Sequence, residues 1–325
     1  MTPELFLLQR RRGVEKKISV LDSKMVDNLV CNLPVDARKE AKCVWLSRIG
    51  KTIEEIQNEQ MEDYKRLMFP FLSKENQILA GNCIFGILPE RVDFNAESEW
   101  NFSNGKYYVG LNDGLCHMIS VFCHMYATAS LIGNFGLLKK WMPSVARYLF
   151  SLQKKCPNSE LLPKDIYPKD DSNYRYSEFL TCACIHYIMG HELGHIEHKD
   201  YDVGVKSISY DMEYKADRKG ALLCYEIAQK DVFRRDQYVL APLLTLCFLK
   251  IWEVENSKTH PPVNERFNRI VKLYADELAL NVFGLESILV DAFKMKDYFC
   301  EVKKEIEYQK SRLEQIEKKY GTKLF

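Results

Sequence analysis

The chain has 325 residues, enough for one large domain or two modest ones. Hydrophobic residues make up 46% and charged residues 28%, an ordinary globular composition that argues against disorder over most of the length. Because 46 Lys and Arg residues balance 45 Asp and Glu residues, the charge gives no reason to expect nucleic acid as the main partner.

The 11 cysteines are scattered and include no CxxC pair; the closest two are Cys182 and Cys184. Such a set is typical of reduced thiols in a cytosolic protein rather than of a disulfide framework. The apolar stretch from Leu5 to Leu8 is too short for the core of a signal peptide. We therefore expect a cytoplasmic protein.

Residues 1–100 are predicted to form a helical N-terminal region. Apolar residues recur there at about helical spacing within a charged background: Ile53, Ile56, Met61, Tyr64 and Met68. Pro70, the Gly81-Asn82 pair and Pro89 then break the pattern.

A strand is predicted over Lys106 to Leu111, after the turn signal Ser103-Asn104-Gly105. Asn112-Asp113-Gly114 is a turn or the cap of the helix that follows. Residues 114–138 contain no Asp, Glu, Lys or Arg and are either a membrane-spanning helix or a buried core helix. We favour the core helix, because histidines and other polar residues interrupt the run.

Further helices are predicted over residues 137–154 and 211–230, and over a segment that Ser177 caps and that runs through His198. Residues 284–325 form a C-terminal helix. Its apolar seam of about three and a half heptads consists of Met295, Phe299, Val302, Ile306, Gln309, Leu313, Ile316 and Tyr320. Two interpretations stay open: a coiled-coil seam for self-association or a partner helix, and an amphipathic helix packed on its own domain.

The chemistry-bearing motif is His191-Glu192-Leu193-Gly194-His195, an HExxH sequence. Helical residues four apart lie on one face, so both imidazoles can bind one metal ion, and Glu192 can accept a proton from metal-bound water. Gly190 and Gly194 weaken a helix interior, which indicates that another backbone approaches closely on that face.

Zinc held by two histidines needs a third protein ligand and an open position for water. Glu213 and Asp217 follow the motif, four residues apart on a predicted helix. One carboxylate can bind the metal while the other hydrogen-bonds a ligand histidine from outside. The metzincin pattern requires a third histidine six residues after His195, but that position is Tyr201, so the pattern fails. His198 lies one turn after His195 and either lines the site or lies on the surface at the helix end.

Three blocks in order resemble one family: the HELGH helix, the ExxAD segment in EYKADRKGA, and THPPxxER from Thr259 to Arg266. The chain is similar there to the integral-membrane gluzincins that include the HtpX heat-shock protease, the CAAX prenyl endopeptidase and Oma-type proteases. A weaker similarity covers Gly105 to Leu115. A more distant one is to the Lit phage-exclusion peptidase, a bacterial HExxH protein of similar size.

The resemblance implies a Zn²⁺ cofactor with His191, His195 and Glu213 as ligands. It implies that Glu192 is the general base and that Asp217 orients a ligand histidine. It also places His260 near the metal, where it would stabilise the transition state. Because family members usually carry several membrane helices and this chain has at most one candidate, a membrane is not expected as its partner.

We therefore predict an α+β, mostly helical fold: a zincin-like core over residues 101–283 with a small sheet and the HExxH helix. The predicted activity is zinc-dependent endopeptidase action on a protein or peptide substrate. Two alternatives stay open: a peptidase-like regulatory or defence protein that cleaves a single cellular target, and a non-catalytic interaction protein with structural zinc.

An extended substrate needs a strand edge beside the zinc. The predicted strand offers the β-forming residues Tyr107, Tyr108 and Val109, and Gly110 leaves room for a second backbone. We expect this strand to border the site with one edge free. The alternative is an interior strand that is paired on both edges.

Overall fold

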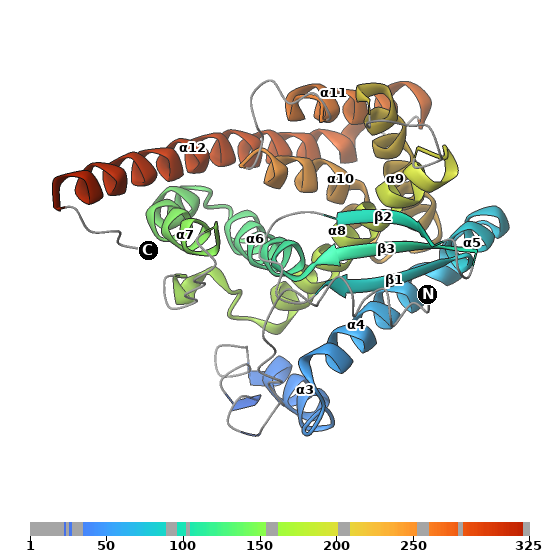
Figure 1. Cartoon of the computed structure of the whole chain (residues 1–325), viewed down its shortest axis with the longest axis horizontal. Helices are drawn as coiled ribbons and strands as arrows, with labels where there is room; N and C mark the ends of the chain where they lie inside the picture. The colour runs from blue at the N-terminus through green and yellow to red at the C-terminus, as the bar shows by residue number, and fades with distance from the viewer. Residues whose placement is uncertain are drawn as a thin grey trace.

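The computed structural model describes residues 23, 26, 27, 35–88, 96–101, 105–153, 162–200, 209–251, 260–278 and 282–320. Most of these residues are helical, and a small sheet lies beside the long helix α8 (Figure 1). The predicted α+β, mostly helical class is confirmed.

The N-terminal helices are α3 (Val35–Leu46), α4 (Ile53–Met68), the short 3₁₀ helix η1 (Phe69–Phe71) and α5 (Lys74–Gly81). Two of them, α4 and α5, begin where the sequence supplies a capping side chain. Thr52 and Glu55 form a capping box at the start of α4, in which each side chain accepts a hydrogen bond from the other's backbone N–H. Ser73 caps α5 with a single hydrogen bond, which its hydroxyl oxygen accepts from the backbone N–H of Asn76.

Three strands form one sheet in the order β1-β3-β2: β1 (Cys83–Leu88), β2 (Ala96–Asn101) and β3 (Lys106–Asn112). β1 pairs with β3 in parallel, and β2 pairs with β3 antiparallel. Within the described ranges no strand pairs with the outer edge of β2. Helix α4 packs against β1, and α8 packs against β2 and β3.

The strand over residues 106–111 is therefore present, but the expectation of a free edge is wrong. Residues 107–111 are paired with β1 on one side and with β2 on the other, so Tyr107, Tyr108, Val109 and Gly110 have no open backbone edge for a substrate. The boundary predicted at residue 100 falls inside β2, so the sheet contains strands from both sides of it.

The apolar run after the sheet is a core helix, as predicted, but it ends earlier. Helix α6 (Asp113–Leu131) is buried along most of its length, with Asn112 at its N-cap position. Helix α7 (Gly136–Gln153) follows after a short turn. No helix in the described part of the chain combines the length and apolar character needed to cross a membrane.

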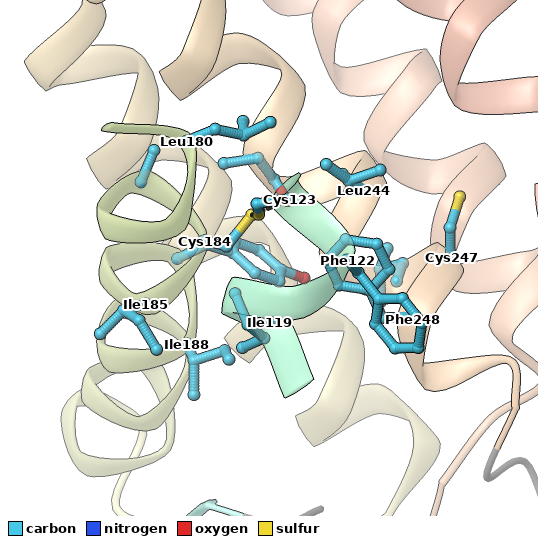
Figure 2. Close-up of a cluster of buried hydrophobic side chains, with 14 of the residues drawn as sticks. Ile119, Phe122, Cys123, Leu180, Cys184, Ile185, Ile188, Leu244, Cys247 and Phe248 are labelled. Carbon is cyan, nitrogen blue, oxygen red and sulfur yellow. Dashed lines mark hydrogen bonds between the residues drawn. The ribbon is translucent and has the colours of Figure 1, made fainter. Parts of the chain in front are cut away.

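Three helices pack against one another in the main core: α8 (Asp171–Glu197), α9 (Tyr210–Lys230) and α10 (Arg235–Leu249). Figure 2 shows side chains of α6, α8 and α10 meeting in one apolar cluster, including Phe122, Cys184 and Phe248. The rings of Phe122 and Phe248 lie 4.9 Å apart. The cysteines within the described ranges are free thiols.

Helix α8 begins at Asp171, about two turns earlier than a cap at Ser177 predicts, because Asp170 caps it by accepting a hydrogen bond from the backbone N–H of Asn173. Ser177 is therefore not a cap. It lies inside the helix and is fully buried, with its hydroxyl 2.6 Å from Nδ1 of His124.

The C-terminal part consists of α11 (Val263–Lys272), the π-helical turn η4 (Leu273–Glu277) and α12 (Val282–Tyr320), which packs on α7 and α10 (Figure 1). The first four seam residues, Met295, Phe299, Val302 and Ile306, are buried in the main core. For them the packed amphipathic helix is confirmed and the coiled-coil seam is wrong. The side chains of the later seam positions lie outside the described residues.

Candidate metal centre

Helices α8 and α9 cross through small residues. A Cβ atom on Gly194 would lie 2.7 Å from Cα of Ala216, and one on Gly190 would lie 2.9 Å from Cα of Gly220. Real Cβ atoms do not approach other atoms so closely, which confirms the close backbone approach predicted from the two α8 glycines. The crossing sets the first turn of α9 against the HExxH turn of α8.

His191, His195 and Glu213 meet at this crossing. Their ligand atoms all lie within 4.8 Å of one another, so the group could hold a metal ion. The two Nε2 atoms are 3.2 Å apart, and the Glu213 oxygens lie 3.7 Å from Nε2 of His191 and 3.6 Å from Nε2 of His195.

The donor set fits a divalent cation. Both Nδ1 atoms lie against carboxylates, which can only accept hydrogen bonds when ionised, so each neutral ring carries its proton on Nδ1 and turns the lone pair of Nε2 inward. Oε2 of Glu213 is buried and has no hydrogen-bond partner. Two imidazole lone pairs and one unsatisfied carboxylate oxygen facing one point are typical of a zinc site.

Asp217 is the centre of a buried hydrogen-bond network around the first histidine. Its carboxylate lies 3.0 Å from Nδ1 of His191 and accepts hydrogen bonds from Tyr187 at 2.8 Å and from Arg266 at 2.6 and 2.7 Å. Burial alone would raise the pKa of Asp217, but the charge and hydrogen bonds of Arg266 outweigh it and hold that pKa well below its ordinary value.

The two histidines differ in their proton affinity. Burial opposes protonation of His191, but the hydrogen bond and charge of Asp217, with the charge of Glu213, raise its pKa overall. Burial, followed by the charge of His191, lowers the pKa of His195 to about 3. Binding a cation to the two Nε2 atoms would displace any proton bound there and leave the Nδ1 protons in place.

The second histidine has a carboxylate of its own. Nδ1 of His195 lies 2.9 Å from Oδ2 of Asp200, which is buried just past the end of α8. Each imidazole of the HExxH motif is thus supported from behind by an aspartate: Asp217 for His191 and Asp200 for His195.

Glu192 is buried and turned toward the sheet. Its Oε2 accepts a hydrogen bond of 2.7 Å from the hydroxyl of Ser98, in the middle of β2. The contact links the edge strand of the sheet to the residue that follows the first histidine.

His260 lies at the border of the site, where Nε2 is 3.7 Å from Oε1 of Glu213 and the side chain is 57% exposed. His198 is an exposed C-cap residue, with Nδ1 2.7 Å from the carbonyl oxygen of Gly194, so it does not line the site. Tyr214 donates to Glu265 on α11 rather than pointing at the metal group.

Three contacts of the site were not anticipated: those of Ser98, Asp200 and Arg266. Arg266 is the last residue of the THPPxxER block, but the sequence alone does not indicate that it pairs with Asp217. Asp200 follows His195 by five residues, a spacing that matches no helical face and so gave no signal. Ser98 belongs to a strand that was not predicted.

Residues 131–280 match the model of the family described as Peptidase U49. The matched segment contains the HExxH helix, Glu213 and Asp217 of α9, His260 and Arg266. No curated protein and no solved structure matches the chain. The match supports the peptidase expectation and a Lit-like family, not the specific likeness to the HtpX, CAAX and Oma proteases; over residues 131–280 this chain is similar to a family of peptidases.

Proposed function

We propose that the chain is a zinc-dependent endopeptidase of the gluzincin type with a zincin-like core. The observation that carries the proposal is the meeting of two HExxH imidazoles and one carboxylate from the next helix within 4.8 Å. The family match independently supports proteolysis.

His191, His195 and Glu213 would hold the metal ion. When bound, zinc lowers the pKa of a coordinated water to about 7 and polarises the scissile carbonyl group. Three protein ligands leave a position for water, whereas a structural zinc is closed by four. The group contains three residues in the described part of the chain, which favours catalysis over the structural-zinc alternative.

Glu192 would act as the general base and then as the general acid. Its carboxylate accepts a proton from the attacking water and returns it to the leaving amide nitrogen, so that the C–N bond breaks and a free amine departs. Asp217 would hold His191 in the ligand tautomer. His260 would donate a hydrogen bond to the developing oxyanion; losing such a donor costs about 10²–10³ in rate.

The outer edge of β2 would bind the substrate. It replaces the strand over residues 106–111 in this role, because the latter is paired on both sides. Two observations support β2: no described strand covers its outer edge, and Ser98 on this strand reaches Glu192. An extended peptide added there would lie beside the general base.

The test is labelling of protein N-termini in cells that express either the wild-type chain or Glu192→Gln. The amide keeps the size of the side chain but cannot accept the proton, so new termini should appear with the wild type alone. Identical sets of termini would contradict the proposal. The number of cleaved proteins separates a general peptidase from a regulatory or defence protein with a single target.

The reduced thiols support a cytoplasmic location as part of the proposal, since disulfides are rare in that compartment. Cell fractionation tests it.

A further inference from the structure

The end of α8 folds back under its own second histidine. The N–H of Asp200 donates to the carbonyl oxygen of His195 at 3.0 Å, and the N–H of Lys199 donates to that of Ile196 at 3.1 Å. These are the two hydrogen bonds of a Schellman motif, which reverses the chain at the end of a helix.

The reversal depends on an unusual backbone conformation. Lys199 has a φ of 58°, and within the described ranges it is the one residue other than glycine with a positive φ. Glycine normally occupies this position, because a Cβ atom makes the left-handed region unfavourable. Strain of this kind persists where the surrounding structure compensates for it, and it is concentrated at functional sites.

The turn has one consequence for side chains: it brings the Asp200 carboxylate behind His195. Oδ2 lies 2.9 Å from Nδ1 of the imidazole, and Asp200 is 4% exposed. Were α8 to continue, a residue five positions on would lie on another face of the helix and could not reach Nδ1. The left-handed conformation of Lys199 therefore makes the contact between Asp200 and His195 possible.

We propose that Asp200 is a positioning residue of the metal centre. By accepting a hydrogen bond from the Nδ1–H group, its carboxylate fixes the tautomer and the angle of the His195 ring. The Nε2 lone pair then faces the position that the ion would share with His191 and Glu213, and the ring becomes a better ligand. The proposal rests on the metal site of the proposed function but not on peptidase activity.

Asp200 acts independently of the other aspartate. Asp217 belongs to α9, contacts His191 and is tied to Arg266, whereas Asp200 follows α8 directly and contacts His195. Loss of either carboxylate leaves the partner of the other histidine in place.

The test is the zinc dissociation constant of purified protein, measured by competition with a chelator, for the wild type, Asp200→Ala and the matched control Glu197→Ala. Glu197 is an exposed carboxylate two residues from His195 that pairs with Lys219, not with a histidine. Asp200→Ala should weaken zinc binding about 10–100-fold, the usual effect of losing an outer carboxylate. Glu197→Ala removes the same charge and should stay within about twofold, as expected of an exposed ion pair.

Two further measurements separate positioning from a merely structural role. The visible spectrum of the Co²⁺-loaded protein reports the ligand field directly and should shift in Asp200→Ala but not in Glu197→Ala. If Asp200→Ala does not fold, Asp200→Asn keeps the shape of the side chain and should weaken zinc binding through loss of the charge.

Lys199 supplies a test that leaves the carboxylate untouched. Lys199→Gly should bind zinc as tightly as the wild type, because glycine adopts the left-handed turn freely. Lys199→Val should weaken binding in the same direction as Asp200→Ala, because a β-branched residue resists a positive φ.

Wild-type affinity and an unshifted Co²⁺ spectrum in folded Asp200→Ala and Asp200→Asn would overturn the inference. A wild-type protein that binds no zinc would overturn it together with the metal centre. A wild-type protein that binds zinc but cleaves nothing would overturn the peptidase proposal alone.

Discussion

The two histidines of the HExxH helix lie one turn apart and are supported in opposite ways. His191 depends on Asp217, which lies on α9 and is held by Arg266 from α11, so three helices must pack before the contact exists. His195 depends on Asp200, five residues further on, through a turn that forms with the end of its own helix. The His191–Asp217 contact thus depends on tertiary packing, whereas the His195–Asp200 contact depends on local backbone conformation.

The largest effect is expected from Arg266→Met. Asp217 would stay buried without its cation, so the free energy of unfolding of the metal-free protein should fall by about 3–5 kcal/mol. Urea denaturation measures it, with Arg218→Met as the control. Arg218 pairs with Glu277 at the surface, and its loss should cost no more than about 1 kcal/mol. Equal losses in the two variants would show that the His191 network does not stabilise the fold.

Gly194→Ala should come next. The new methyl group would meet Cα of Ala216 at 2.7 Å and force α8 and α9 apart, at a cost of about 1–3 kcal/mol in unfolding free energy. Zinc affinity should fall with it, because Glu213 moves away from the histidines. Gly81→Ala is the control: its methyl group would meet its nearest neighbour, Phe69, at 4.0 Å, and the variant should lose no stability. Undiminished stability in Gly194→Ala would contradict the close crossing.

Much of this site could be predicted, because its parts follow helical spacing. HExxH and the pair Glu213 and Asp217 each place two side chains on one face of a helix, and the two α8 glycines pointed to the crossing. Such features can be predicted from the residue spacing within a single helix, without knowing how the helices pack.

The sheet and its contacts could not be predicted in the same way. β1 is an apolar run of six residues, buried along most of its length, and periodicity cannot distinguish such a run from part of a helix. The edges of β3 depend on which strands lie beside it, a long-range property. Ser98 and Asp200 were missed because one belongs to an unrecognised strand and the other to a left-handed turn at a lysine.

Asp217→Asn tests whether the contact with His191 affects both metal binding and packing. Zinc affinity should fall about 10–100-fold, as His191 loses its charged partner. The metal-free protein should also lose stability, because Arg266 is left with Glu213 at 3.5 Å as its nearest anion. Chelator competition and urea denaturation measure the two losses. Loss of zinc affinity without loss of stability would mean that the His191–Asp217 contact, like the His195–Asp200 contact, does not depend on the packing of several helices.

Lys199→Gly should have the smallest effect on stability. Relief of the left-handed strain is offset by the greater freedom of glycine in the unfolded chain, so the unfolding free energy should rise by less than about 1 kcal/mol. Thermal unfolding of the metal-free protein measures it. A clear fall in the midpoint would mean that the lysine side chain, not the backbone turn, stabilises this helix end.

The metal content of the purified protein is the most direct test of the metal centre. We expect about one zinc ion per wild-type chain, because two imidazoles and one carboxylate converge on a single point. Glu213→Gln should lose most of that zinc, since the amide replaces the one carboxylate ligand. Elemental analysis of both proteins after the same purification gives the answer. Equal zinc in the two, or none in the wild type, would contradict the metal centre described here.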